Sequence, residues 1–188
     1  TTPIQNGLGS VTYNATNSNN LDINPIAWSQ NLSGFTIYII ARPTSLPVTQ
    51  FPLLVSDTNL GIWWNGTNWS VGQSVGNHGT VTLTNDTTKF HIYGFVFDGT
   101  QTGNANRLKF RYDRADQTLT FTGTIGTTTG TPTYLFFGGD NRGSVGAGNA
   151  LSSTYMDGYI GEILIFTRAL SDADCVATEN YIKTKWNI

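Results

Sequence analysis

Short runs of apolar and β-branched residues recur along this chain, and glycine, asparagine, proline or serine stands between one run and the next. This rhythm is typical of an antiparallel sandwich, because a βαβ fold would place helical patterns of about 10–15 residues between its strands. We therefore expect an all-β fold of two antiparallel sheets. The expected strands cover residues 11–14, 35–42, 53–56, 60–64, 68–71, 81–84, 90–98, 107–112, 118–122, 134–137 and 159–166.

Two of the expected strands are apolar on both faces. Residues 35–42 read Phe-Thr-Ile-Tyr-Ile-Ile-Ala-Arg, and residues 90–97 read Phe-His-Ile-Tyr-Gly-Phe-Val-Phe. Strands of this composition are covered on both sides, so we expect them in the middle of a sheet. Residues 107–112 alternate instead, which predicts one dry and one wet face. The dry face would hold Leu108, Phe110 and Tyr112, and the wet face Arg107, Lys109 and Arg111.

One segment near the end of the sequence is expected to be helical, from Asp172 to about Lys185. Ser171 precedes it, and Asp174 stands where a capping-box-like start requires an acidic residue. We expect an apolar stripe to hold this helix against the sandwich as a C-terminal lid. The residues of that stripe are Ala173, Ala177, Tyr181, Val176, Ile182 and Trp186.

Composition limits the partners that the chain can have. Only 12% of its 188 residues are charged, and its net charge is -2. A nucleic-acid surface would need a clear excess of Lys and Arg, so we expect no such partner. Apolar runs stay well below the roughly 20 residues of a membrane-spanning helix, so no membrane insertion is expected. The length suits a single domain over residues 1–188, in which Cys175 has no second cysteine to pair with.

Four stretches of the sequence are informative as a set. They are residues 11–23, residues 35–43, residues 90–99, and residues 157–172 together with the helix end at 181–186. Their order and separation resemble the concanavalin A-like superfamily, in particular its laminin G-like jelly rolls. The resemblance covers nearly the whole chain and implies a jelly-roll sandwich with one C-terminal helix. That superfamily includes lectin-like domains, adhesion modules, phage decorations, and some hydrolases and lyases, so the resemblance implies fold more strongly than function.

Paired carboxylates, which polysaccharide hydrolysis requires, are not evident in the sequence. Glycosidases of this superfamily carry a Glu-x-Asp-x-Glu type of strand, whereas this chain has only Glu162 and Glu179, in different elements. A pair drawn from Asp57, Asp140 and Asp157 is the remaining alternative. We therefore expect no enzymatic activity and rank a polysaccharide hydrolase or lyase third among the functions.

The two histidines do not suggest a catalytic arrangement either. His91 lies inside an apolar strand and is expected to be a structural residue with satisfied hydrogen bonds. His78 lies in a glycine-flanked segment, with no nucleophile elbow of the G-x-S-x-G type in the chain. We expect His78 to be part of a solvent-exposed loop.

An aromatic hairpin is the first candidate binding site. Asn65-Gly66 between two β runs predicts a two-residue turn, which would pair Trp63 with Asn68. The core face would then hold Leu60, Ile62, Trp64, Trp69 and Val71. Trp63 would point away from the core beside Asn65 and Asn68, as a platform for a sugar ring whose hydroxyls the amides bind. Alternatively, Trp63 packs beneath a loop or against a neighbouring subunit.

The glycine-rich segment 138–143 is the second candidate site. It reads Gly-Gly-Asp-Asn-Arg-Gly, and Asp140, Asn141 and Asp157 offer the oxygen ligands that calcium prefers. The same segment also suits an ordinary turn stabilised by Arg142. We therefore take Asn141 and Arg142 as candidate ligand-binding residues and Asp140 and Asp157 as candidate calcium ligands, and we expect no required cofactor.

Two functions remain in competition. The first is a non-catalytic module for glycan binding, adhesion or surface display, outside the cell or on a virion, with glycans as partners. The second is a purely structural capsid-decoration or tail component of a phage, with neighbouring subunits as partners in a homo-oligomer or larger assembly. The aromatic hairpin and the asparagine-rich loops favour the first, and the low charge and abundance of Thr and Gly favour the second.

Overall fold

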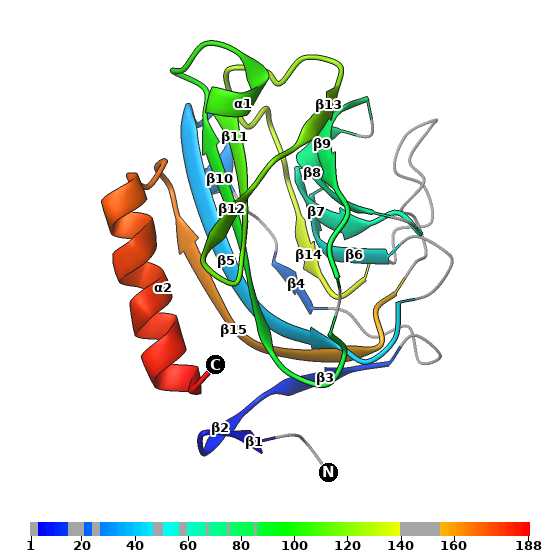
Figure 1. The fold of residues 1–188 in the computed structure, drawn as a ribbon. Helices are drawn as coiled ribbons and strands as arrows, with labels where there is room; N and C mark the ends of the chain where they lie inside the picture. Colours follow the sequence, from blue (N-terminus) through cyan, green and yellow to red (C-terminus); the bar gives the residue numbers. More distant parts are fainter. Residues whose placement is uncertain are drawn as a thin grey trace.

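The computed structural model of the chain describes residues 4–14, 21–23, 27–46, 51–56, 60–66, 68–74, 76–84, 86–139 and 155–188. These residues form two antiparallel sheets packed face to face, with a long helix outside one of them (Figure 1). The expected all-β sandwich with one C-terminal helix is therefore confirmed. A further helical element, α1 (Asn104–Arg107), is a single turn. No helix within the described ranges is long and apolar enough to cross a membrane.

The six-stranded sheet has the order β12-β11-β10-β5-β15-β3. Its strands are β3 (Val11–Tyr13), β5 (Gly34–Pro43), β10 (His91–Asp98), β11 (Leu108–Tyr112), β12 (Ala115–Gln117) and β15 (Gly158–Phe166). The seven-stranded sheet has the order β13-β9-β8-β7-β6-β14-β4. Its strands are β4 (Leu21–Ile23), β6 (Phe51–Ser56), β7 (Gly61–Trp64), β8 (Trp69–Ser74), β9 (Asn77–Val81), β13 (Thr120–Thr122) and β14 (Leu135–Phe137). Strands β1 (Ile4–Gln5) and β2 (Leu8–Gly9) pair separately.

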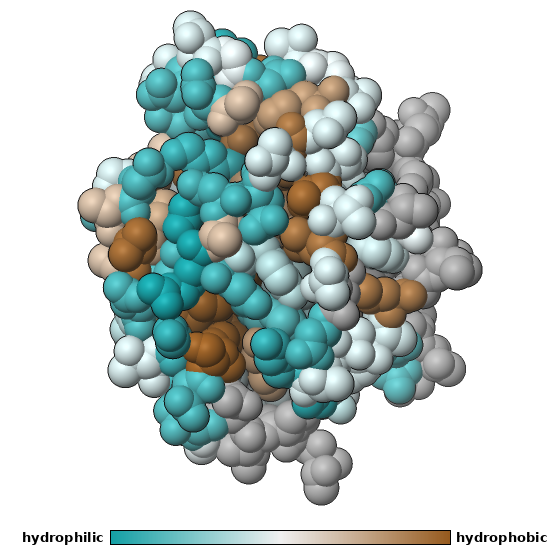
Figure 2. Space-filling model, viewed as in Figure 1, coloured by the Kyte–Doolittle hydropathy of each residue, from teal (hydrophilic) through white to brown (hydrophobic). Residues whose placement is uncertain are grey.

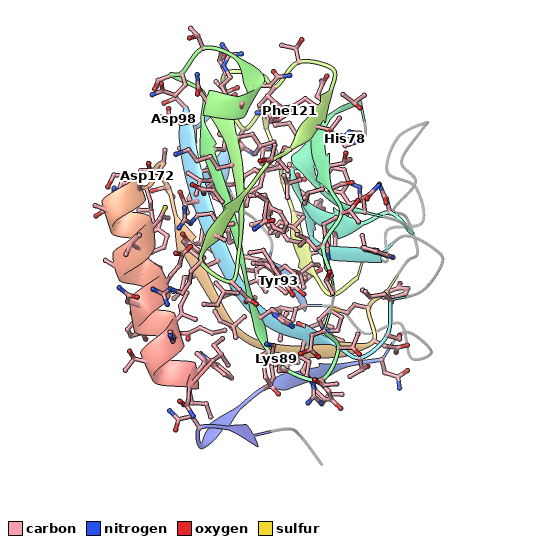
Figure 3. The ribbon with its side chains drawn as sticks, viewed as in Figure 1. His78, Lys89, Tyr93, Asp98, Phe121 and Asp172 are labelled. Carbon is pink, nitrogen blue, oxygen red and sulfur yellow. The ribbon has the colours of Figure 1, made fainter. Side chains whose placement is uncertain are left out.

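The two strands that are apolar on both faces lie in the middle of the six-stranded sheet, as predicted. Strand β5 pairs with β10 on one side and with β15 on the other. On the inner face, Tyr93 is part of the core between the sheets (Figure 3). On the outer face, Tyr38 and Ile40 belong to a second apolar cluster, which packs beneath the helix. Because side chains alternate along a strand, β5 contributes residues both to the core between the sheets and to the cluster beneath the helix.

Helix α2 (Asp172–Trp186) begins as the sequence predicts, because the Ser171 hydroxyl accepts a hydrogen bond from the Asp174 amide at 3.2 Å. Its buried face agrees with the predicted stripe only at Ile182 and Trp186. The buried helix residues are Cys175, Glu179, Ile182 and Trp186, whereas Val176 and Tyr181 are 45% and 51% exposed. The predicted stripe also included Ala173 and Ala177, which are exposed, and it left out Cys175 and Glu179. A glutamate occupies the buried face because an arginine of the sheet meets it.

That arginine is Arg111, and its burial corrects the predicted wet face of residues 107–112. Leu108 and Phe110 point into the core as expected. Arg111 points outward, but α2 covers it, and only 5% of the residue is exposed. Alternation predicted which face each side chain takes, but not that a helix would lie over the polar face.

One strand is displaced from its predicted position. Strand β9 covers Asn77–Val81, whereas the sequence predicted a strand at 81–84. Gly79 lies in the middle of β9, where a Cβ would come within 2.9 Å of two Leu119 side-chain atoms. Glycine is usually unfavourable inside a strand, but here it admits the close approach of a neighbouring side chain.

Candidate functional site

The aromatic hairpin forms, but its turn is centred one residue later than predicted. Strands β7 and β8 pair Trp64 with Trp69 and Trp63 with Ser70. The Asn65 amide donates to the Asn68 main-chain oxygen at 3.0 Å, and Gly66 takes a positive φ of 88°. Glycine adopts that conformation without steric cost, and the pairing of Trp64 with Trp69 is what places the turn. The pairing shifts by two residues, so each side chain keeps its predicted face.

Trp63 is buried, and the predicted exposed platform is therefore wrong. It points away from the core, as expected, but only 2% of the residue is exposed. It clusters with Phe136 and Tyr134, and its ring centroid lies 5.6 Å from that of His78. The residues of β7 and β14 are apolar on both faces, and the argument that predicts a covered outer face for β5 applies to them equally. The structure supports the packing alternative for Trp63.

The two asparagines of the hairpin form hydrogen bonds within the turn. The Asn65 side chain accepts from the Asn68 amide at 2.7 Å and donates to the Ser70 hydroxyl at 3.2 Å. The Asn68 side-chain oxygen accepts from the Thr82 hydroxyl. These contacts give both amides a role in shaping the turn. A role in ligand binding stays a prediction.

The predicted calcium site falls mostly outside the described residues. Asp140, Asn141 and Arg142 lie outside them, as does Asp57. Asp157 is half-buried, and its main-chain oxygen accepts from the Thr44 amide at 2.9 Å. No group of three or more His, Cys, Asp or Glu side chains comes together in the part of the chain that the structure describes. The calcium site and the binding roles of Asn141 and Arg142 stay predictions.

Both glutamates hold α2 against the six-stranded sheet. Glu162 accepts from Lys185 Nζ at 2.6 Å and from Trp186 Nε1 at 2.7 Å. Glu179 is fully buried and accepts from Arg111 through Nε at 2.6 Å and Nη2 at 3.0 Å.

The environment of Glu179 also shifts the titration of its neighbours. The hydroxyl of Tyr38 donates to Glu179 at 3.1 Å. The hydrogen bond from Arg111 to Glu179 raises the pKa of Arg111, and burial raises the pKa of Tyr38. The guanidinium therefore remains charged beneath the helix, and the phenol remains protonated.

His91 is a structural residue, as predicted. Its Nδ1 lies 2.7 Å from Asp113 Oδ2, and its Nε2 lies 2.8 Å from the main-chain oxygen of Asp86. The other carboxylate oxygen of Asp113 accepts from the Ile92 amide at 3.0 Å. These contacts fix the turn between β11 and β12 to the beginning of β10.

Trp28 is the exposed tryptophan that the sequence analysis missed. It lies in the 3-10 turn Ala27–Ser29 and is 42% exposed. Its ring stacks on that of Phe35, with centroids 6.4 Å apart and planes inclined by 25°. One face of the indole is therefore supported by a core residue, while part of the ring remains in contact with water.

Hydrogen bonds to the segment 127–132 hold the backbone beside Trp28. The Asn31 amide donates to Gly130 at 2.6 Å, the Thr129 amide to Leu32 at 2.9 Å, and the Thr129 hydroxyl to Ser29 at 2.6 Å. We call residues 27–33 with 127–132 the Trp28 platform. Its exposed polar side chains include Asn31 and Thr128. A supported indole beside amide and hydroxyl groups can pack against a sugar ring and bind its hydroxyls.

A signal for Trp28 exists in the sequence, but periodicity does not reveal it. Residues 27–33 read Ala-Trp-Ser-Gln-Asn-Leu-Ser, with neither alternation nor helical spacing. An aperiodic polar segment predicts a loop. A lone tryptophan in such a loop has few neighbours to bury it, so partial exposure could have been expected.

Comparisons with known proteins identify the fold. No family model and no curated protein matches the sequence. Among solved structures, the chain is similar to a Trypanosoma rangeli sialidase, with a TM-score of 0.65 and 12% identity over 96% of this chain and 28% of that one. It is similar to mouse laminin α1 domains LG4-5, with a TM-score of 0.62 and 12% identity over 91% of this chain and 46% of that one.

A third similar structure is the Ruminococcus gnavus IT-sialidase CBM40 bound to α2,3-sialyllactose. Its TM-score is 0.57, with 12% identity over 91% of this chain and 100% of that one. The chain therefore spans less than half of the sialidase and laminin chains but the whole of the CBM40 chain. At this level of identity the likenesses show the fold alone. The fold is the concanavalin A-like, laminin G-like jelly roll that the sequence resembles.

Proposed function

We propose that this chain is a non-catalytic module for glycan binding or adhesion, displayed outside the cell or on a virion. The observation that carries the proposal is the Trp28 platform. An indole that is 42% exposed, yet stacked on the core ring of Phe35, offers a rigid apolar surface. Tryptophan is enriched at interfaces because its large apolar ring carries a polar N–H, so a supported, exposed indole suits contact with a ligand or partner.

Two further observations support a binding role. The CBM40 chain of similar fold and length was solved with a bound sialylated glycan. In this chain, both glutamates take part in contacts between α2 and the six-stranded sheet. The Glu162 carboxylate accepts from Lys185, and the Glu179 carboxylate accepts from Arg111. Glycoside hydrolysis needs two carboxylates that face one another across a substrate, which is a different arrangement.

A glycan array tests the proposal directly. Biotinylated chain, tetramerised on streptavidin, is applied to the array as wild type and as Trp28→Ala. We expect the variant to lose at least about tenfold in binding, since a buried aromatic contact is often a hot spot. Its free energy of unfolding should fall by less than about 1.5 kcal/mol, because the ring is only partly buried.

Tyr181→Ala is the matched control, because Tyr181 is an aromatic residue of similar exposure on α2. It should bind as wild type does. Equal glycan binding by Trp28→Ala would show that the platform is not the site. A wild-type chain that binds no glycan would contradict the proposed function, and the release of reducing ends from a polysaccharide panel would contradict its non-catalytic nature.

A further inference from the structure

A groove of about 300 Å³ lies at the end of α2, where the helix and the six-stranded sheet separate. Residues 89–92 before and within β10 form one side, the turn after β11 forms another, and residues 183–188 form the third. Figure 2 shows an apolar patch surrounded by hydrophilic surface in the region where Figure 1 marks the C-terminus. Figure 3 places Lys89 near this end of the helix.

The floor of the groove is apolar and preformed. Phe90 and Ile92, each 3% exposed, and the partly buried Ile188 belong to the cluster that packs α2 on the sheet. The groove therefore gives access to one end of the apolar layer between α2 and the six-stranded sheet. A side chain placed there would continue the packing of that layer.

The rim carries two cations for which the described residues supply no carboxylate partner. The Arg114 guanidinium and the Lys183 ammonium form no ion pair with a carboxylate in the described residues. Every other Lys or Arg that the structure describes contacts a carboxylate, a main-chain oxygen or an aromatic ring through its side chain. Those residues are Arg42, Lys89, Arg107, Lys109, Arg111, Arg168 and Lys185. Arg114 and Lys183 both line this groove, in a chain whose net charge is -2.

The turn that carries Arg114 is held in an unusual conformation. Asp113 and Arg114 have φ angles of 47° and 75°, which are uncommon for residues other than glycine. Both carboxylate oxygens of Asp113 are occupied, one by His91 and one by the Ile92 amide. The carboxylate at the groove is therefore engaged within the protein, and the turn that presents Arg114 is anchored.

We propose that this groove binds an acidic peptide segment of a partner protein. A Glu or Asp side chain of the segment would lie between Arg114 and Lys183, and an apolar side chain next to it would rest on Phe90, Ile92 and Ile188. This site goes beyond glycan binding. It lies at the His91 end of β10, whereas the Trp28 platform lies at the other end, where the Gly99 amide bonds Ser33. The length of β10 separates them by about 25 Å.

A peptide suits the groove better than a sugar or a free small molecule. The rim carries the cations Arg114 and Lys183, whose charge a neutral sugar would not balance, whereas a carboxylate of an acidic peptide would. Small-molecule sites enclose about 70–90% of the ligand, whereas this groove opens outward. A side chain supplied by a larger partner would be covered from outside by that partner. Two cations that line the same groove as an apolar floor are complementary to a carboxylate with an apolar neighbour.

The test is an NMR titration of the isotope-labelled full chain with acetyl-Leu-Glu-Leu-amide. We expect saturable amide shifts at Arg114, Lys183 and Ile188, with an affinity that falls as salt is raised. The neutral peptide acetyl-Leu-Gln-Leu-amide should bind at least about tenfold more weakly. The same loss is expected for the double variant Arg114→Asn/Lys183→Gln, in which asparagine tolerates the positive φ.

Arg168→Gln is the control variant, because it removes one positive charge at the opposite end of α2. It should bind the acidic peptide as wild type does. Equal binding of the two peptides, or unchanged binding by the double variant, would overturn the proposal. Equal shifts with acetate alone would overturn the role of the apolar floor. A dimer seen in sedimentation and lost in the double variant would assign the groove to a second copy of this chain instead.

Discussion

Each sheet turns one face to the shared core and one face outward, and the two outer faces are built differently. The outer face of the six-stranded sheet packs against α2 and includes a buried ion pair between Arg111 and Glu179. The outer face of the seven-stranded sheet holds Trp63 and Phe136, beside small polar residues such as Ser70. The first face depends on a charged contact with a defined geometry, and the second on neutral aromatic packing.

The difference shows what a strand pattern can and cannot predict. Strands that are apolar on both faces, such as β5 and β7, have a covered outer face in both sheets. The pattern does not say what kind of contact does the covering. Arg111 looked like a solvent-exposed residue, and Trp63 like a ligand platform, yet both are at least 95% buried. The predictions below test how much each contact contributes.

The largest effect is expected for Trp186→Ala, which tests whether α2 is an integral layer of the molecule. The ring is 2% exposed and lies 5.5 Å from that of Phe90, between centroids. A Cβ on Gly161 would come within 2.2 Å of it, so the fit is close. We expect a loss of about 4–5 kcal/mol in the free energy of unfolding, measured with urea.

Val176→Ala is the control for this change, because Val176 is on the same helix and 45% exposed. Its free energy of unfolding should change by less than about 0.5 kcal/mol. A similarly small effect for Trp186→Ala would mean that the helix end is frayed and that the six-stranded sheet does not need its cover.

Trp63→Ala tests the other outer face, and we expect a loss of about 3–4 kcal/mol in the free energy of unfolding. The indole is 2% exposed and packs with Phe136 and Tyr134, so its removal leaves a cavity. Trp28→Ala serves for comparison, since that ring is 42% exposed and should cost far less. If the order of the two variants is reversed, the outer face of the seven-stranded sheet is open to solvent and the two faces differ more than we infer.

Glu179→Leu sharpens the comparison, because it separates the charge from the packing beneath α2. The single change removes the buried carboxylate partner of Arg111 and leaves its guanidinium only one carboxylate, that of the half-exposed Asp116, 2.6 Å from Nη1, so we expect a loss of about 3 kcal/mol. In the double variant Arg111→Met/Glu179→Leu both charges are gone, so unfolding should return to within about 1 kcal/mol of wild type. The unfolding free energies of both variants and of Arg111→Met, measured with a chemical denaturant, complete a double-mutant cycle. Losses that simply add would show that the two groups do not interact.

Sequence reasoning reached the fold because the fold depends on many residues at once. The central positions of β5 and β10 and the Ser171 cap each followed from local patterns. The site depends on single contacts between distant residues. Nothing in the local sequence shows that Glu179 meets Arg111, 68 positions away, and so Glu179 was left out of the predicted buried face of α2.

The hairpin shows a second kind of limit. Asn65-Gly66 and Gly66 with its successor are both acceptable turns, and only the pairing of Trp64 with Trp69 decides between them. The exposure of Trp63 was predicted wrongly for a related reason, and that of Trp28 was not predicted at all. Periodicity predicts which way a residue points, but exposure also depends on whether anything lies in front of it.

The smallest effect is expected at the edge of the helix–sheet contact, for Asp172→Asn. Asp172 accepts from Lys109 Nζ at 2.7 Å but its side chain is 73% exposed, so the pair should contribute less than about 1 kcal/mol. The hydrogen bond to Lys109 lowers the pKa of Asp172 in the folded state. A lowered pKa means that the contribution is fully present above the unfolded value of about 3.9 and is lost as pH falls through the folded value.

The difference in unfolding free energy between wild type and Asp172→Asn should therefore be constant from pH 7 to about pH 5 and should shrink below about pH 4. Raising the salt concentration at pH 7 should shrink it too, since exposed pairs are screened. Glu179 is fully buried, so the loss caused by Glu179→Leu should respond much less to salt. A difference for Asp172→Asn that grows in acid, or that resists salt as the buried pair does, would mean that the edge of the contact is as dry as its centre.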